Sequence, residues 1–272
     1  MKTTRGVSHF SKRVRQTPAL FTNYPRVFAN LVLAETPWKP TEMVFRMRNG
    51  YTVTCPNADG ARFPLYEIFA DDAYELDELC AGVDPTATVL DVGGQIGSFS
   101  LAVALALPRA RVHVYEASPT SAEFIRRNVL ANGLEDRIEV HSEALSAEVG
   151  NFTFRDSGDA SGHNGLTAPD SIGGTTVTVR SVPFDQAVAD AGGDVQIVKM
   201  DVEGAEYDIV LRSAPASWSA VRKVVMEYHP MPGRSLDDLL AFFAGVGLTP
   251  VRHEPGTRAG LGVIWLSREP AR

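Results

Sequence analysis

The stretch that most constrains the fold of this chain is Thr88 to Ala104, which reads TVLDVGGQIGSFSLAVA. A short buried parallel strand is predicted at Val89, Leu90 and Val92, because a continuous apolar run bounded by turn residues is typical of such strands. The glycines that follow allow a tight turn with close backbone approach, and Ser98 is placed to cap a helix. Free backbone N–H groups at that helix N-terminus could bind a polar or anionic ligand group.

A second strand is predicted at Arg111 to Glu116, read RVHVYE, and it ends in a carboxylate. In doubly wound folds an acid in this place accepts hydrogen bonds from the two hydroxyls of a ligand's ribose. Both NAD and S-adenosylmethionine carry that ribose. The glycine pattern from Gly93 is G-G-x-x-G, whereas the dinucleotide pattern is G-x-G-x-x-G. The spacing therefore argues against an NAD oxidoreductase, which the fold alone leaves open.

Length and charge exclude several classes of protein. With 272 residues and 44% hydrophobic content, the chain can bury the core of one α/β domain with an extension. The net charge is −7, so nucleic acid is not an expected partner. No apolar run approaches the roughly 20 residues that cross a bilayer. Cys55 and Cys80 have no metal spacing and are expected to be core thiols of a cytoplasmic protein, with a disulfide as the alternative.

The first 80 residues are expected to form an arm and a cap segment, and residues 81–272 to form the main domain. The first 20 residues are basic and contain no acid. They lack the apolar segment of a targeting peptide, so we interpret them as a frayed or partner-contacting arm. The cap is predicted to contain a helix within Phe21 to Trp38, a hairpin from Met43 to Val53 and a helix from Glu67 to Leu79.

Beyond the second strand, helices and strands continue to alternate. A helix is predicted from Ser118 to about Asn132, with Thr120 and Glu123 at capping-box spacing. The further predicted strands are Ile138 to His141, the antiparallel pair Phe152 to Phe154 and Thr175 to Val182, Val195 to Met200, Val221 to Glu227, and a final hairpin of Leu248 to His253 with Gly262 to Leu266. The glycine-rich loop from Asp156 to Gly174 is interpreted as an active-site lid or a disordered tip.

Four motifs occur in a fixed order along the chain. They are DVGGQIG at 91–97, YEASP at 115–119, VKMDVEGAEYDIV at 198–210 and VVMEYHP at 224–230. Together they resemble the FkbM-type S-adenosylmethionine-dependent methyltransferases over roughly residues 67–230. The usual first motif of that family is DVGANIG, so Gly94 replaces an alanine and Gln95 an asparagine. Both replacements keep the turn chemistry, since glycine only loosens the turn and glutamine retains an amide.

The resemblance implies a Rossmann-like class I methyltransferase: an α/β fold whose seven-stranded doubly wound sheet has an antiparallel last strand, preceded by the N-terminal cap segment. It also implies S-adenosylmethionine as cofactor and S-adenosylhomocysteine as product. The amino-acid tail would be held around Asp91 and the turn backbone, the ribose at Glu116, and the adenine near Glu143, for which a solvated turn acid is the alternative. The full expected cofactor set is Asp91, Gly93, Gly94, Gln95, Gly97, Glu116, Ala117, Glu143, Ala144 and Asp201.

Acidic residues follow the fourth predicted strand. Asp201 comes directly after it, where ligands bind in open α/β sheets. Glu203 and Glu206 are interpreted mainly as acids that favour the N-terminus of the next helix through its dipole. Lys199, inside the strand, is expected to reach an internal carboxylate.

Glu227 and His229 are the clearest candidates for catalysis. At i and i+2 of an extended segment they point to one side, and with Asp201 they could converge at one cleft. Three roles remain open. His229 could be a general base oriented by Glu227, the three residues could bind a divalent metal, or the pair could stabilise the loop before Pro230.

We expect methyl transfer to a hydroxyl of a small-molecule natural product or sugar by direct in-line attack. One alternative is N-methylation of a carbamoyl or amide nitrogen, and another is a cofactor-binding module without catalysis. The expected partner is the small-molecule acceptor, with neither nucleic acid nor membrane. A cluster of aromatic residues near the N-terminus could cover the cleft or form a homodimer contact: Phe10, Phe21, Tyr24, Phe28 and Trp38.

Overall fold

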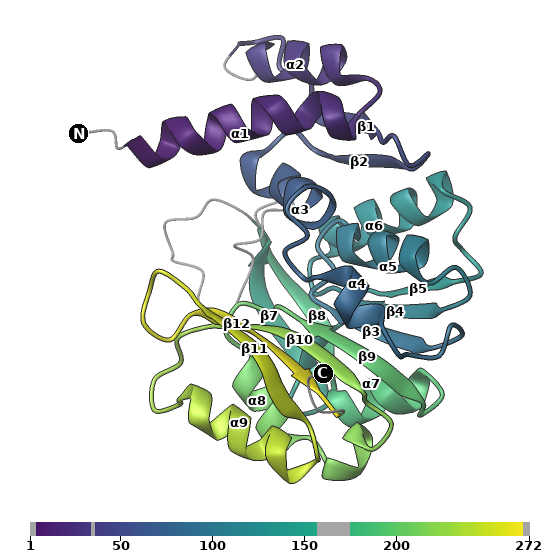
Figure 1. Ribbon diagram of the computed structural model, residues 1–272, viewed down its shortest axis with the longest axis vertical. Helices are drawn as coiled ribbons and strands as arrows, with labels where there is room; N and C mark the ends of the chain where they lie inside the picture. Colours follow the sequence, from purple (N-terminus) through teal and green to yellow (C-terminus); the bar gives the residue numbers. More distant parts are fainter. Residues whose placement is uncertain (1–3, 34–35, 157–174, 269–272) are drawn as a thin grey trace.

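A seven-stranded sheet lies at the centre of the molecule, with helices on both faces (Figure 1). The computed structural model describes residues 4–33, 36–156 and 175–268. The spatial order of the strands is β11 (Thr249–Pro255), β12 (Gly262–Ser267), β10 (Lys223–Tyr228), β9 (Val195–Met200), β3 (Thr88–Val92), β4 (Arg111–Tyr115) and β5 (Ile138–His141). β12 is antiparallel to both of its neighbours, and the pairs from β10 to β5 are parallel. The predicted Rossmann-like sheet with an antiparallel last strand is confirmed.

The side chains of each central strand alternate between two hydrophobic cores. Val89 packs in the core with helices α5 (Ser98–Ala106) and α6 (Pro119–Ala131). Its neighbour Leu90 packs in the core with α7 (Phe184–Asp190), α8 (Glu206–Arg212) and α9 (Leu236–Gly245). Because both faces are covered, both sets of strand residues must be apolar, which explains the nearly continuous apolar runs in the sequence.

The glycine turn lies where the strand order reverses, between β3 and β9. Gly93 has φ +82°, and a Cβ there would lie 1.8 Å from the carbonyl oxygen of Asp201. A Cβ on Gly94 would lie 2.2 Å from Cγ1 of Val114. The expectation that Gly94 only loosens the turn is therefore wrong, because the packing leaves no room for the alanine of the family pattern.

The helix caps differ from those predicted. Gly97, at φ +85°, is the N-cap of α5, and Ser98 is already inside the helix, so it is not the cap. Ser118 caps α6, since its Oγ accepts a hydrogen bond of 3.1 Å from the N–H of Ser121. The predicted capping box of Thr120 and Glu123 is therefore not the device that starts α6.

The predicted N-terminal hairpin forms and is fastened to α6. Its strands are β1 (Glu42–Arg46) and β2 (Thr52–Pro56), paired antiparallel. The amide of Asn128 accepts from the N–H of Thr54 at 2.7 Å and donates to its carbonyl at 3.0 Å. Asn132 makes the same two bonds to Thr52, both of 2.8 Å. Two amide side chains on a helix thus take the place of a neighbouring strand.

The N-terminal arm, for which the sequence predicts a frayed or partner-contacting segment, is helical in its described part, so it is not frayed there. The segment forms α1 (Thr4–Leu20), followed by α2 (Tyr24–Val32). Arg13 donates to a carboxylate oxygen of Asp71 at 2.8 Å, and Thr17 shares a hydrogen bond of 2.8 Å with the hydroxyl of Tyr66. These partners lie about fifty residues away in the sequence, so only the tertiary structure supplies the reason for an ordered helix.

The single helix predicted from Glu67 to Leu79 is two helices, α3 (Asp59–Phe69) and α4 (Leu76–Cys80). Asp72 and Glu75 have φ values of +48° and +50°, which an α-helix cannot contain. The chain therefore turns between the two helices, and the side chain of Asp72 accepts a hydrogen bond from the N–H of Leu76 at 3.0 Å.

A smaller sheet stands beside the main one. It contains β6 (Ala144–Ser146), β8 (Thr175–Pro183) and β7 (Gly150–Asp156), and the predicted antiparallel pairing of β7 with β8 is confirmed. The interpretation of the loop from Asp156 to Gly174 concerns residues 157–174, which lie outside the described residues. Cys55 and Cys80 are free thiols, as predicted. In the described part of the chain, no helix has the length and apolar character needed to span a membrane.

Candidate functional site

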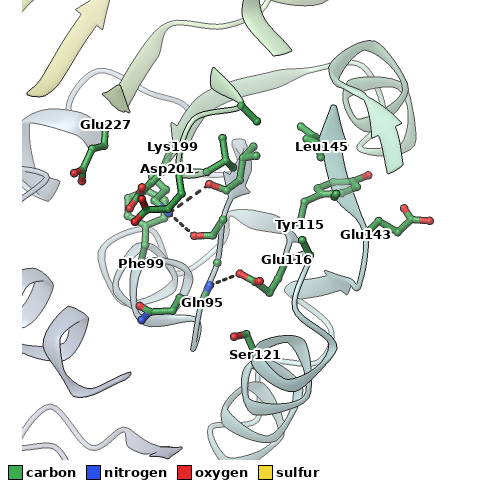
Figure 2. A pocket seen from close by; sticks show the side chains of 18 of the residues that line it. Gln95, Phe99, Tyr115, Glu116, Ser121, Glu143, Leu145, Lys199, Asp201 and Glu227 are labelled. Atoms are coloured by element: carbon green, nitrogen blue, oxygen red, sulfur yellow. Dashed lines mark hydrogen bonds between the residues drawn. The ribbon is translucent and has the colours of Figure 1, made fainter. Parts of the chain in front are cut away.

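A cavity of about 960 Å³ opens at the carboxyl ends of the central strands (Figure 2). The glycine turn, Glu116 and Ala117, and Asp201 line it from the main sheet. Glu143 and Ala144 line it from the side of the smaller sheet, and Glu67 from α3 in the N-terminal segment. A volume of this size is at the upper end for ligand sites, which leaves room for a cofactor and an acceptor together.

Glu116 is braced by backbone donors at one end of this cavity. Its Oε2 accepts from the N–H of Gln95 at 2.7 Å and its Oε1 from the N–H of Ser118 at 2.8 Å. Burial raises the pKa of Glu116 to about 7, although the two backbone hydrogen bonds and the charge of Lys199 lower it. The carboxylate is therefore fixed in direction at the place predicted for the ribose.

Gln95 connects the glycine turn to the N-terminal segment. It has φ +53°, a conformation that glycine and asparagine adopt more easily than glutamine. Its side-chain amide donates to the carbonyl of Gly60 in α3 at 3.0 Å. The family's asparagine is shorter by one methylene group, so the longer glutamine here suits a contact across the cavity wall.

Asp91 lies behind the turn and does not line the cavity. Its side chain is completely buried, accepts from Ser100 Oγ at 2.6 Å and pairs with Lys199 Nζ at 3.3 Å. Gly97 also lies outside the lining. Asp91 supports the turn through its contacts with Ser100 and Lys199. Its expected direct contact with the amino-acid tail of the cofactor stays a prediction.

Lys199 joins the turn to the fourth strand of the fold. Its Nζ donates to the carbonyl of Gly93 at 2.5 Å and of Val92 at 3.4 Å. Burial lowers its pKa, but Asp91 and Asp201 more than offset this, so the pKa is raised and the side chain is charged. The prediction that Lys199 reaches an internal carboxylate is confirmed by its pairing with Asp91.

The adenine side of the predicted site is less polar. Ala117, Ala144 and the ring of Tyr115 line the cavity there, and the Tyr115 ring stacks on His141 with centroids 4.3 Å apart. Glu143 is not a solvated turn acid: its side chain is 19% exposed and its Oε1 accepts from Arg180 at 2.9 Å. The hydroxyl of Tyr115 is buried and has no hydrogen-bond partner among the described residues.

Four carboxylates from three parts of the fold line the opposite end of the cavity. We call Glu67, Asp201, Glu203 and Glu227 the carboxylate cluster. Burial and the charge of Asp201 raise the pKa of Glu67 and of Glu227 to about 7. Burial also raises the pKa of Asp201. These three carboxyl groups are therefore easier to protonate than exposed acids.

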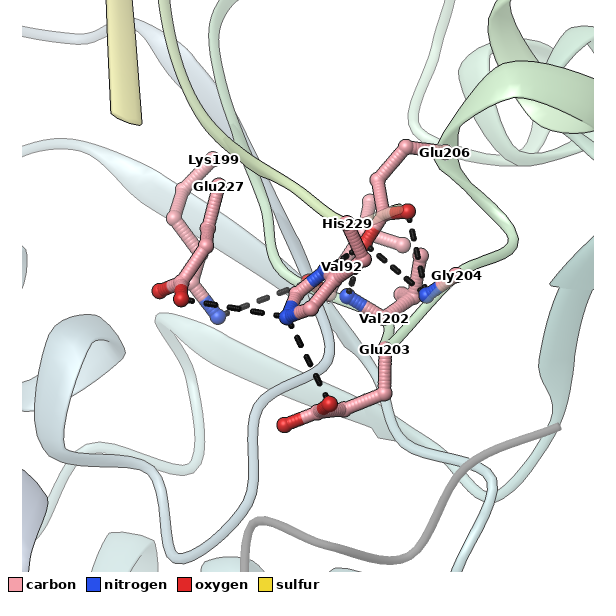
Figure 3. A network of polar contacts seen from close by, with 8 residues as sticks. All are labelled: Val92, Lys199, Val202, Glu203, Gly204, Glu206, Glu227 and His229. Carbon is pink, nitrogen blue, oxygen red and sulfur yellow. Dashed lines mark hydrogen bonds and ion pairs between the residues drawn. The ribbon is translucent and has the colours of Figure 1, made fainter. Parts of the chain in front are cut away.

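His229 lies beside Glu203 and Glu227 of this cluster (Figure 3), although it does not itself line the cavity. Its Nε2 is 3.4 Å from Oε2 of Glu203 and 3.8 Å from Oε1 of Glu227. Ligand atoms of Asp201, Glu203 and His229 all lie within 4.8 Å of one another. The predicted convergence of Asp201, Glu227 and His229 is thus present in the structure, with Glu203 as an additional member.

Glu206, and not Glu227, orients the imidazole. Its completely buried carboxylate accepts from His229 Nδ1 at 2.8 Å and from the N–H groups of Val202 and Gly204 at 3.2 and 3.1 Å. Burial lowers the pKa of His229, but the hydrogen bond and charge of Glu206, with Glu203 and Asp201, raise it to about 9. The raised pKa favours the imidazole with protons on both nitrogens, a form that can only donate hydrogen bonds, and the role of His229 as general base stays a prediction.

The sequence reasoning missed two residues of this site. For Glu67 the sequence pattern predicts only a place in a helix, although a carboxylate among the apolar residues of an amphipathic segment is a signal of a functional position. Glu206 was interpreted as a helix-favouring acid. Its partner His229 lies 23 residues away, directly after β10, and no spacing rule connects the two positions.

Comparison with known proteins shows which family this chain belongs to. Residues 91–248 match the methyltransferase FkbM domain. The chain is 29% identical over 246 residues to the 31-O-demethyl-FK506 methyltransferase FkbM of Streptomyces tacrolimicus, covering 79% of this chain and 92% of that protein. It is 24% identical over 224 residues to methyltransferase sdnD of Sordaria araneosa, covering 71% and 85%.

Among solved structures, the chain is similar to a methyltransferase FkbM from Methylobacillus flagellatus, with a TM-score of 0.47 and 14% sequence identity. The match covers 89% of this chain and 59% of that one. The family match spans the glycine turn, Glu116, the segment from Lys199 to Glu206 and the Glu227–His229 pair. These are the residues that shape both ends of the cavity. The chain belongs to the FkbM family of S-adenosylmethionine-dependent methyltransferases.

Proposed function

We propose that the protein transfers the methyl group of S-adenosylmethionine to a hydroxyl oxygen of a small-molecule natural product or sugar. The observation that carries this proposal is one cavity with two unlike ends. A carboxylate braced by backbone N–H groups, Glu116, lies at one end, and the carboxylate cluster lies at the other. The first suits the ribose of the cofactor, and the second suits an acceptor that must lose a proton.

The cofactor brings a methyl group already activated by its sulfonium. Glu116 would accept hydrogen bonds from both ribose hydroxyls, and the backbone of the glycine turn would face the amino-acid tail. In the reaction the acceptor oxygen forms a bond to the methyl carbon while the carbon–sulfur bond breaks. The hydroxyl proton leaves to a carboxylate of the cluster, and S-adenosylhomocysteine is released as a neutral thioether.

Positioning supplies most of the acceleration in such a reaction, since an in-line approach at about 3 Å replaces a bimolecular encounter. An alcohol is a weak nucleophile until it begins to lose its proton, so a nearby proton acceptor also contributes. The carboxylate cluster provides such a proton acceptor. A neutral amine acceptor would not need one, so the cluster favours an alcohol. One relative also supports an oxygen acceptor, because the FkbM of Streptomyces tacrolimicus is named for an O-demethylated substrate.

Methylation of a carbamoyl or amide nitrogen is the second candidate. Its lone pair is delocalised, so it needs a proton acceptor at least as much as an alcohol does. The same cluster therefore favours it over methylation of a free amine. A protein that binds the cofactor without catalysis is the third candidate.

Two measurements separate these candidates. Calorimetry with S-adenosylhomocysteine should show one site per chain, and absence of binding would overturn the cofactor assignment. The protein is incubated with ¹³C-methyl S-adenosylmethionine and with the small molecules made by the enzymes that neighbouring biosynthetic genes encode. The ¹³C NMR spectrum of the product should show an O-methyl resonance. An N-methyl resonance would establish the second candidate, and binding without any labelled product would establish the third.

A further inference from the structure

We propose that Asp201, Glu203 and His229 bind a divalent cation, Mn²⁺ or Mg²⁺, at the carboxylate end of the cavity. Their ligand atoms come from the loop after β9 and from the end of β10, and all lie within 4.8 Å of one another. Nε2 of His229 faces Oε2 of Glu203 at 3.4 Å. Two donors bound to one metal at about 2.1 Å and roughly right angles are about 3.0 Å apart, so a small inward shift of the Glu203 side chain would complete the pair.

The carboxylate of Glu206 orients the imidazole of His229 so that Nε2 can bind a metal ion. Nδ1 of His229 donates to the completely buried Glu206 at 2.8 Å, which leaves Nε2 to face the carboxylates (Figure 3). Histidines that bind metals almost always donate their other ring nitrogen to a carboxylate or carbonyl in this way. Glu206 is itself held by the N–H groups of Val202 and Gly204, so the imidazole orientation is fixed by the same loop that carries the other two ligands.

The number of carboxyl groups at this end also favours a cation. Asp201, Glu203, Glu206 and Glu227 surround one imidazole. The charge of Lys199 acts on Asp201, but its ammonium makes its direct contacts with Asp91 and the carbonyl of Gly93. No N–H or O–H of a described residue donates to the carboxylate of Asp201, which borders the cavity. A carboxylate in that position gains most from a metal ion or a cationic ligand group.

The donor set indicates which ion fits. Carboxylate oxygens with one imidazole suit Mg²⁺ and Mn²⁺, while thiolate donors, which select softer metals, do not occur in the set. This role rests on the proposed function: the bound ion would receive the acceptor hydroxyl and favour loss of its proton. Glu227, 3.8 Å from the imidazole and bordering the cavity, would then be placed to take that proton.

A second group of possible ligands gives the control. Nδ1 of His113 lies 3.3 Å from Nε2 of His141, and Glu139 lies 3.6 and 3.8 Å from the two rings. The two imidazoles meet as hydrogen-bond partners, and the side chain of Glu139 is 66% exposed. The variant Glu139→Gln therefore removes a carboxylate from the competing group without touching the cavity.

The test uses the full chain after treatment with EDTA, titrated with MnCl₂ alone and followed by calorimetry and by the electron paramagnetic resonance of free Mn²⁺. We expect one Mn²⁺ per chain. Asp201→Asn and Glu203→Gln should each weaken binding at least about 10-fold, Glu206→Gln about 10- to 100-fold, and Glu139→Gln less than about 2-fold. Circular dichroism establishes that each variant folds, S-adenosylhomocysteine binding checks Glu203→Gln and Glu206→Gln in addition, and the partly exposed Glu203 is the position least able to disturb the core.

Absence of Mn²⁺ binding at millimolar concentration by a protein that still binds S-adenosylhomocysteine would overturn the cation site and leave the methyltransferase proposal intact. Mn²⁺ binding by a protein that does not bind S-adenosylhomocysteine would support the cation site and overturn the methyltransferase proposal. Binding that Glu139→Gln abolishes and Glu203→Gln does not would place the ion on the surface group, which also contradicts the proposal.

Discussion

The two ends of the cavity are built in different ways. The part of the cofactor end predicted for the ribose and the amino-acid tail comes from one continuous stretch, β3 through the start of α6, and depends on backbone groups with Glu116 as the main charged side chain. The carboxylate end combines side chains from α3, the loop after β9 and β10. The first end needs a fixed backbone shape, whereas the second needs several charges held together against their repulsion. A local sequence pattern can therefore specify the first but not the second.

The largest effect is expected where the two ends touch. Gly93→Ala places a Cβ 1.8 Å from the carbonyl of Asp201 in a left-handed backbone position. We expect a loss of about 3 kcal/mol or more in the free energy of unfolding, and loss of S-adenosylhomocysteine and Mn²⁺ binding together. Urea unfolding and calorimetry measure both.

Gly133→Ala is the matched control for that substitution. Gly133 also has a positive φ, of +64°, but a Cβ there meets nothing within 4 Å. The control should cost only about 1 kcal/mol. Equal losses for the two variants would mean that close packing at the junction of the two ends is unimportant.

Glu116→Gln should break the cofactor end alone. The amide keeps one oxygen acceptor and loses the charge, so hydrogen bonds to the ribose weaken by about 3 kcal/mol in total, or roughly 100-fold in affinity. Calorimetry with S-adenosylhomocysteine measures the change, and Mn²⁺ affinity should stay the same. The exposed residue Glu123 gives the control variant Glu123→Gln, for which a similar loss would contradict a specific role for Glu116.

The cofactor end should also respond to pH. Burial raises the pKa of Glu116 to about 7. The carboxylate that accepts from the ribose is thus formed as the pH rises through 7 and lost as it falls below. Affinity for S-adenosylhomocysteine should fall about 10-fold between pH 8 and pH 6. Glu116→Gln should flatten this dependence, and a wild-type profile that is already flat would show that the ribose is bound elsewhere.

The smallest effect on cofactor binding is expected from Glu67→Gln. Glu67 borders the carboxylate end from α3, away from Glu116, so S-adenosylhomocysteine affinity should change less than about 2-fold. Methyl transfer to the acceptor should fall about 10-fold, because the substitution removes a charge from the acceptor side. If cofactor affinity fell as much as turnover, the two ends would not be separable.

The sequence could predict the sheet, the glycine turn, Glu116 and the meeting of Asp201 with Glu227 and His229, because each depends on a local pattern or on strand order. It could not predict that Glu206 orients His229 or that Glu67 borders the site. Those contacts arise when elements far apart in the chain pack together. The helix α1 was missed for the same reason, since Asp71 and Tyr66 hold it from outside its own sequence.

The hydrogen bonds between α6 and the N-terminal hairpin have a consequence for solubility. A two-stranded hairpin has open edges whose unpaired N–H and C=O groups can recruit another chain into a larger sheet. Along β2, Asn128 and Asn132 satisfy both backbone groups of Thr54 and of Thr52. The edge that would otherwise be a template for aggregation is closed by two side chains, so replacing both asparagines should promote self-association before it unfolds the domain.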